Sequence, residues 1–406
     1  MVAELTLWMY IGITAAFLVA WINGANNAGN AIGTVVGARV LNARKALIMA
    51  AVFDLAGALV FGEFVSATLM RGIVDPSRIE RVDLLIGGMC AALIGTFTWV
   101  FISTLIKVPM SISQAIVGGV MGFGLVAAGV EAILWRKVLE VVASWVYLPF
   151  MSIAISVGLY KLYKHLAKGL TRSRLILISA VFMYLTVFTT VFLLMVKTAK
   201  MEDLVYAAKI STGLSMLASI AYVAYAVRRI PAIDLNHAER EVFKHLLIAS
   251  CMAMAFSHGA NDVANAAGPL AAILYTVENG HPPGPGTPVT PFALVLSAIG
   301  LSTGILVWGY RILETIGEKI VPLTPETGFI AQFSGALTTL IVTRLGLPVS
   351  TTVAIVGAVA GVGIARGTEY LNIRTLLKIV AMWFIGFPFV ALLSALMVLG
   401  YMHMVS

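Results

Sequence analysis

Apolar segments of about 20 residues, each long enough to cross a bilayer core about 30 Å thick as a helix, follow one another almost to the end of the chain. Of its 406 residues, 60% are hydrophobic and 11% are charged. Soluble globular domains carry roughly a quarter charged residues, so this composition excludes them. The sequence therefore predicts an all-α polytopic membrane protein with no room for a separate soluble domain.

We expect about twelve crossings joined by short loops. They are placed at residues 5–38, 45–67, 83–106, 109–130, 138–160, 175–196, 203–227, 246–278, 291–310, 327–346, 348–365 and 379–402.

Basic residues predict the orientation of these crossings, because cytoplasmic loops carry an excess of Lys and Arg. If the N-terminus is outside, cytoplasmic loops hold 18 of the 27 basic residues. We therefore expect both termini outside a cell membrane, with membrane lipid around the chain. The net charge of +8 then reflects topology, so we expect no nucleic-acid partner.

Two related polar segments interrupt the apolar sequence. The first Asn box, Gly24–Ala31, reads Gly-Ala-Asn-Asn-Ala-Gly-Asn-Ala, and the second Asn box, Gly259–Ala266, reads Gly-Ala-Asn-Asp-Val-Ala-Asn-Ala. Extended to Gly33 and Gly268, the two match at six of ten positions. They lie on crossings that enter from opposite faces, which indicates an inverted repeat.

A second duplicated segment supports this division. The first hydroxyl box, Pro109–Gly124, matches the second hydroxyl box, Pro348–Gly363, at nine of 16 positions. We expect a first inverted repeat over residues 1–165, two linking crossings with cytoplasmic loops over 166–240, and a second inverted repeat over 241–406. Each repeat has five crossings.

The repeats predict broken helices at matching places. Crossings 5–38 and 246–278 exceed 30 residues, too long for one straight helix across about 30 Å, so we expect each to break at its Asn box. Each hydroxyl box starts with Pro and then offers Ser or Thr, the pattern of a helix N-terminus. Broken helices in two inverted repeats indicate a secondary transporter with its site near the midplane.

The acidic residues indicate where a cation binds. Asp262 is the deepest acid in the predicted membrane, and Asp54 also lies within a crossing. A charge at the bilayer centre costs roughly 2.5 to 3.5 kcal/mol, so Asp262 needs a cavity, a cation or a partner. The oxygen ligands proposed from the residues are Asn26, Asn30, Asn261, Asp262, Asn265 and Asp54.

No Lys or Arg lies at the centre of a predicted crossing. An anionic substrate would therefore need helix N-terminal N–H groups, hydroxyl donors and co-bound cations. Phosphate, with four oxygens to satisfy, fits such a two-sided site. The proposed phosphate contacts are Ser111, Ser113, Gln114, Ser350, Thr351 and Thr352, with Asn27 and Asp262. Sodium is favoured over protons as the coupling ion because most proposed ligands cannot titrate.

Other interpretations stay open at this point. The Gly and Asn residues could serve helix packing alone, and the hydroxyls could be plain N-caps. The substrate could be sulfate, arsenate or a metal–phosphate complex, and coupling could use protons. A passive anion channel belongs to a different class. An enzyme is disfavoured, and we expect no cofactor, because no catalytic cluster or nucleotide-binding glycine loop is found.

At these boxes the chain resembles the inorganic phosphate transporter (PiT) family. Residues 259–266 match the family motif letter for letter, and Pro348 to Thr352 resemble its second motif. The resemblance implies phosphate uptake driven by sodium or protons, extracellular termini and a homodimer. It also implies a cation-ligand role for Gln332, at a position where some relatives carry Glu. The chain departs from the family at Asn27, usually Asp, and at Asp54, often Glu.

Overall fold

The structure is a computed structural model that describes residues 2–79, 81–198, 203–230, 234–284, 286–343 and 349–405. Within these ranges the chain is helical throughout, apart from loops and one isolated β-bridge between Val74 and Ile133. The prediction of an all-α membrane protein is confirmed.

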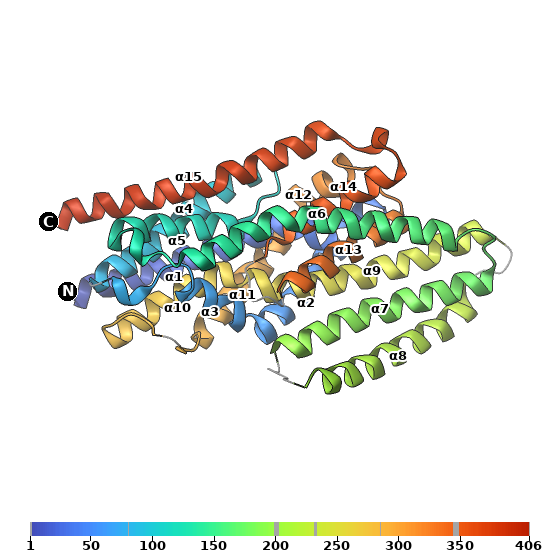
Figure 1. The fold of residues 1–406 in the computed structure, drawn as a ribbon, viewed down its shortest axis with the longest axis horizontal. Helices are drawn as coiled ribbons and strands as arrows, with labels where there is room; N and C mark the ends of the chain where they lie inside the picture. The colour runs from blue at the N-terminus through green and yellow to red at the C-terminus, as the bar shows by residue number, and fades with distance from the viewer. Residues whose placement is uncertain are drawn as a thin grey trace.

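The helices follow in chain order (Figure 1). They are α1 (Val2–Gly37), α2 (Ala43–Phe61), α3 (Glu63–Arg71), α4 (Val82–Leu105), α5 (Ile112–Ala128), α6 (Trp135–Leu166), α7 (Arg172–Thr198), α8 (Leu204–Arg229), α9 (Leu235–Asp262), α10 (Ala264–Asn279), α11 (Pro291–Trp308), α12 (Tyr310–Glu314), α13 (Pro325–Thr343), α14 (Thr351–Arg366) and α15 (Ile373–Val405). A π-helical turn, Thr315–Lys319, follows α12.

Seven helices of the described chain are long and apolar enough to cross a membrane: α1, α4, α6, α7, α8, α11 and α15. The bent pair α2 and α3 would make an eighth span. Helices α5 and α14 are apolar but have only 17 and 16 residues. The figure of twelve crossings therefore stays a prediction.

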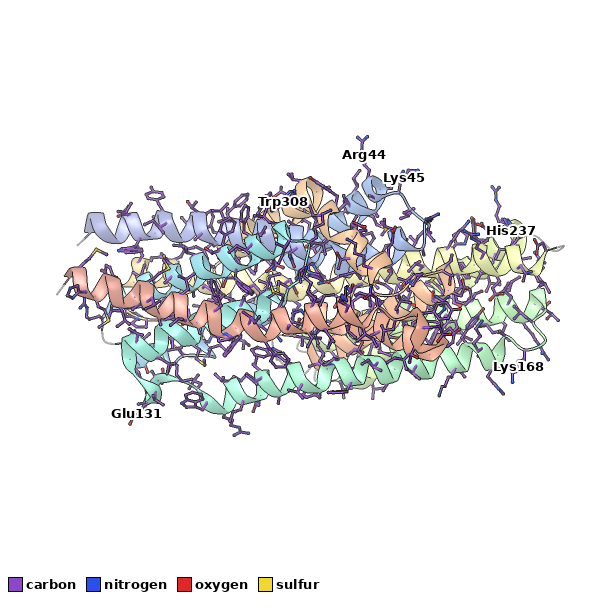
Figure 2. All side chains as sticks on the ribbon, turned by 90° about the horizontal axis from the view of Figure 1, so that it is seen from above. Arg44, Lys45, Glu131, Lys168, His237 and Trp308 are labelled. Atoms are coloured by element: carbon purple, nitrogen blue, oxygen red, sulfur yellow. The ribbon has the colours of Figure 1, made fainter. Side chains whose placement is uncertain are left out.

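Both termini lie at the same end of the bundle (Figure 1). Figure 2 shows Glu131, just before α6, at that end, and Lys168, just after α6, at the opposite end, where His237 also lies. Helix α6 thus runs the length of the bundle. Helices α7 and α8 pack on each other along one edge.

The two halves of the chain are interleaved rather than separate. Helix α1 packs on α11 and α2 packs on α9, while α5 packs on α15 and α14 on α6. Glycine allows the backbones to touch. A methyl carbon added at Gly304 would lie 1.8 Å from the backbone oxygen of Trp21, and one at Gly259 would lie 1.9 Å from that of Asp54. Only a residue without a side chain fits at these crossings.

The predicted break in the first Asn box is wrong, whereas the second box is interrupted. Helix α1 runs without a break through Gly24–Ala31, but α9 ends at Asp262 and α10 begins at Ala264. The two copies also differ at a later matching position, where α1 has Thr34 and α10 has Pro269, which cannot donate to the carbonyl of Asn265.

The predicted crossing at 45–67 is not a single straight helix. Helix α2 ends at Phe61, and the chain turns by 64° around Gly62 before continuing as α3. No Pro marks this bend in the sequence. At the bend Gly62 lies against Val263, at the break between α9 and α10, where a side chain would collide.

The glycine contacts predict a stability difference between two matched variants. Gly304→Ala should lower the free energy of unfolding by about 1–3 kcal/mol, because its methyl group would overlap the Trp21 backbone. Gly158→Ala should leave stability unchanged or raise it slightly, since nothing lies within 4 Å of its added methyl carbon. Thermal unfolding in detergent measures both, and equal losses would contradict the contact.

Candidate functional site

The four boxes meet in the interior of the bundle, where α1, the end of α9, and the starts of α5 and α14 come together. Every residue proposed as a ligand from the sequence is at least 94% buried, the most exposed being Gln114 at 6%. Pro348, the first residue of the second hydroxyl box, lies outside the described residues. A buried polar cluster of this size requires internal hydrogen bonds.

Two helices begin inside this cluster, as the hydroxyl boxes predict. Ser111 caps α5 by accepting a hydrogen bond from the Gln114 N–H at 3.4 Å. Ser350 caps α14 by accepting one from the Val353 N–H at 3.2 Å. The first turns of both helices still carry N–H groups that the helices themselves cannot satisfy. Each N-terminus therefore offers donors and a partial positive charge.

The two helix starts contact each other reciprocally. The Thr352 hydroxyl donates to the Met110 carbonyl at 2.9 Å, and the Ser113 hydroxyl donates to the Val349 carbonyl at 3.5 Å. Met110 and Val349 each immediately precede a capping serine. The N–H groups of both helices are thus brought to one place from the two halves of the chain.

Asp262 connects the two Asn boxes. Its carboxylate accepts from Asn27 at 2.8 Å and from Asn261 at 3.0 Å, and its backbone carbonyl accepts from Asn23 at 3.0 Å. Asn27 also donates to the Asn23 side chain at 3.0 Å. These bonds hold a fully buried carboxylate that would otherwise be costly.

The first Asn box also reaches both hydroxyl boxes. Asn30 donates to the hydroxyl of Thr352 at 2.8 Å and to that of Thr351 at 3.3 Å. Asn26 donates to the hydroxyl of Thr104 at 2.9 Å and accepts from the Met110 N–H at 2.7 Å. The continuous α1 therefore binds the starts of α5 and α14 through its side chains.

His258 links the two acids of the membrane interior. Its Nδ1 contacts the Asp54 carboxylate, and its Nε2 lies 3.3 Å from the Asp262 carboxylate. All three side chains are at least 98% buried. Asp54 is thereby joined to the Asn boxes through an imidazole rather than directly.

Several buried oxygens of the cluster lack a hydrogen-bond donor among the described residues. They are Asn30 Oδ1, Asn261 Oδ1 and Asp54 Oδ2. Unsatisfied oxygens of this kind are uncommon in native interiors and fit a cation such as sodium, which binds neutral and anionic oxygens. Asn265 presents the opposite case, since its amide nitrogen is the atom left without a partner.

Gln332 has a different environment from the other proposed ligands. Its amide donates to the α1 carbonyls of Asn30 and Ala31 at 3.1 and 3.0 Å, and it accepts from the Thr34 hydroxyl at 2.6 Å. These contacts bind α13 to α1 immediately after the first Asn box. Gln332 therefore supports the helix that carries Asn30.

Sequence reasoning missed three members of the cluster. Asn23 lies one residue before the first Asn box and four before Asn27, a spacing that could have indicated a shared helix face. His258 directly precedes the second Asn box, but the sequence names no partner for it. Thr104 carries no motif, and its contact with Asn26 spans 78 residues.

The Asp54–His258 contact predicts strong coupling between two variants. His258→Phe leaves a buried carboxylate unpaired, which should cost about 3–5 kcal/mol of unfolding free energy. The double variant, His258→Phe with Asp54→Leu, should lose about 1–3 kcal/mol less unfolding free energy than the sum of the two single losses. Reversible unfolding in mixed micelles measures this. Pairing His258→Phe with Glu131→Leu, a surface change with an 89% exposed side chain, should give additive losses. Additive losses for His258→Phe and Asp54→Leu would contradict a direct contact between His258 and Asp54.

Comparison with known proteins agrees with this arrangement. The phosphate transporter family matches residues 23–394. A candidate phosphate permease of Pyrococcus furiosus is 36% identical over 389 residues, which cover 94% of this chain and 93% of the permease. Inorganic phosphate transporter 2-1 of Arabidopsis thaliana, a chloroplastic protein, is 32% identical over 422 residues, covering 96% and 71%.

A solved structure of a sodium-dependent phosphate transporter shares the fold. It superposes with a TM-score of 0.92 at 36% sequence identity, covering 98% of this chain and 99% of that one. Both the sequence and the fold therefore match over nearly the full length. The chain belongs to the phosphate transporter family.

Proposed function

We propose that this chain imports inorganic phosphate by sodium symport with alternating access. The observation that carries the proposal is the reciprocal contact of two capped helix N-termini beside Asp262 and the asparagines. The first turns supply N–H donors for an anion, and the adjacent oxygens supply ligands for a cation. This pairing of opposite charges at one buried place suits co-transport rather than catalysis, so we do not propose an enzyme.

Phosphate would lie between the first turns of α5 and α14. Its oxygens would accept from backbone N–H groups and from hydroxyls, which is how helix N-termini bind anions without Lys or Arg. The proposed contacts are Ser111, Ser113, Gln114, Ser350, Thr351 and Thr352, with Asn27 and Asp262 approaching through the cations. Sulfate has no support from the relatives, whose names specify phosphate.

Sodium is proposed as the coupling ion for two reasons. The relative of known structure is sodium-dependent by name. In this chain, Asn30, Asn261 and Asp54 each leave a buried oxygen without a donor among the described residues. Asn26, Asp262 and Asn265 complete the proposed ligand set. Gln332 would support this set indirectly, by binding α1 next to Asn30. Because one box has Asp262 where the other has Asn27, the Asp262 side should bind its cation more tightly.

Proton coupling is the second candidate, and a specific contact favours it. His258 lies between Asp54 and Asp262, so a titratable group sits beside the proposed cation ligands. A metal–phosphate substrate would use the same oxygens. A passive channel would need an open path, whereas the ligand residues here are at least 94% buried.

Internal symmetry of the contacts supports two inverted repeats, and hence alternating access. Gly24 lies against the Leu301 carbonyl, and Gly259 lies against the Asp54 carbonyl. A methyl carbon added at either glycine would lie 1.9 Å from that carbonyl oxygen. Each half supplies one glycine and one carbonyl. We propose repeats over residues 1–165 and 241–406, joined by the linking region 166–240. The twelve proposed crossings are the seven long apolar helices, the pair α2 and α3, the pair α9 and α10, and the helices α5, α13 and α14.

We propose a cell-membrane location with both termini outside. The basic residues favour this orientation, and the termini lie at the end opposite Lys168 (Figures 1 and 2). A homodimer surrounded by lipid is proposed from the family resemblance.

Uptake of labelled phosphate into proteoliposomes tests the site assignment. Asp262→Asn and Ser350→Ala should each lower the initial rate at least about tenfold, since each removes an interaction made to the substrate or its cation. Matched controls are Asp75→Asn in the exposed loop and Thr303→Ala, whose hydroxyl donates to carbonyls of its own helix, α11. Wild-type rates in both site variants would refute the assignment.

Imposed gradients test the coupling ion. An inward sodium gradient should drive phosphate accumulation above equilibrium at constant pH, because the proposed cation ligands are mainly neutral oxygens. A pH gradient without sodium should give no accumulation. The reverse pattern would establish proton coupling, and flux without accumulation under either gradient would establish a channel.

A further inference from the structure

A group of exposed basic residues has no acidic partner. This basic cluster consists of Lys168 in the turn after α6, Arg174 at the start of α7, and Arg228 and Arg229 at the end of α8. None of the four side chains forms an ion pair with another residue of the described ranges. At the end of the bundle that carries the termini, by contrast, Arg136 and Lys137 both pair with Glu140 at 3.4 Å. The basic cluster therefore holds positive charge that the chain itself does not neutralise.

Hydrogen bonds from α7 bring the members of the basic cluster together. The Arg172 guanidinium donates to the carbonyls of Val227 and Ile230 at 2.6 and 3.0 Å. These two carbonyls flank the arginine pair of α8. The Arg174 guanidinium donates to the Gly169 carbonyl at 3.3 Å, beside the lysine of the cluster. All four residues therefore lie at one corner of the bundle, at the end opposite the termini (Figure 2). Grouped like charges repel one another, so the cluster favours an anion from outside the chain.

The neighbouring helices offer no free acid to this corner. No Asp or Glu occurs in α6 after Glu140, in α7 or in α8. Helix α9 packs on α7, and the acids near its start are already engaged. Asp234 caps α9, Glu239 accepts from the Tyr163 hydroxyl, and Glu241 pairs with Lys244. The compensating anion must come from the surroundings.

Exposed apolar side chains continue directly from the basic cluster. Arg174, Leu177 and Val181 are three and four residues apart, so they share one face of α7. Leu177 is 66% exposed and Val181 is 50% exposed. Tyr225, which is 45% exposed, lies one turn before Arg229 on α8, at the edge of the bundle (Figure 1). Tyrosine and basic residues beside exposed aliphatic residues are typical of the level of the lipid headgroups.

We propose that the basic cluster binds the headgroup of an anionic phospholipid, with the acyl chains along the exposed face of α7. Each guanidinium can hold two phosphate oxygens with parallel hydrogen bonds, and the lysine adds a further charge. The lipid needs a net negative charge, so phosphatidylglycerol fits and phosphatidylcholine does not. In the proposed orientation this is the cytoplasmic leaflet, whose surface is anionic. The site requires only the fold in a bilayer, so it stands independently of the proposed transport function.

Two matched fluorescent reporters test the proposal. Leu177→Cys and Leu139→Cys each place a label three residues after an arginine, at positions that are 66% and 63% exposed. The arginine before Leu177 is the unpaired Arg174, whereas the one before Leu139 is Arg136, which pairs with an acid. The native cysteines are buried, so the label attaches to the introduced one.

Quenching by nitroxide-labelled lipids in reconstituted vesicles measures which lipid lies beside each reporter. Phosphatidylglycerol and phosphatidylcholine are compared at the same reporter, so the depth of the label cancels. At Leu177→Cys, phosphatidylglycerol should bind at least about fivefold more tightly than phosphatidylcholine, as one contact with a Lys or Arg already implies. At Leu139→Cys the two lipids should bind equally.

Charge variants connect this preference with the basic cluster. Arg228→Gln with Arg229→Gln should lower the preference at the Leu177 reporter to that at the Leu139 reporter. Arg136→Gln with Lys137→Gln should leave it unchanged. Raising potassium chloride should weaken the preference in the chain without charge substitutions, because salt screens exposed charges. Replacing chloride by inorganic phosphate at equal ionic strength should have no effect.

Four results would overturn the proposal. Equal quenching by both lipids at the Leu177 reporter would mean that the cluster only sets topology. A preference that survives the loss of Arg228 and Arg229 would place the lipid elsewhere. Specific displacement by inorganic phosphate would assign the cluster to free phosphate. No quenching by either lipid would show that a second copy of the chain covers this face.

Discussion

The structure depends on satisfying one carboxylate in the membrane interior. Asp262 is 98% buried, and its partners come from both halves of the chain: Asn23 and Asn27 on α1, and Asn261 and His258 on its own helix. A carboxylate without such partners would be too costly in hydrocarbon surroundings. The interleaved packing of the halves is the arrangement that supplies them.

Close backbone contact makes this arrangement possible. The polar side chains of the Asn boxes are short, so α1 and α9 must lie against their neighbours for these side chains to reach across. Gly24 and Gly259 begin the two boxes and lie against Leu301 and Asp54. Packing and chemistry are thus not rival explanations of the Asn boxes, because the glycines bring the helices together and the asparagines use that proximity.

Much of this organisation was predictable from the sequence. Hydropathy predicted the helical class. The duplicated boxes indicated which segments would meet, since polar side chains buried in an apolar chain need hydrogen-bond partners. The continuity of α1 was not predictable from length, because Asn26 and Asn30 find partners on other helices and leave the backbone hydrogen bonds intact. The bend at Gly62 and the His258 bridge were also missed. Both lie at contacts between residues about 200 positions apart, which periodicity does not report.

If phosphate and sodium occupy adjacent parts of one buried cluster, as we propose, each should strengthen binding of the other. The most direct test is equilibrium binding of labelled phosphate to the purified protein across a sodium titration at constant ionic strength. We predict that the phosphate Kd falls as sodium rises, and that Asp262→Asn abolishes this dependence. A phosphate Kd that is independent of sodium and unchanged in Asp262→Asn would contradict the account.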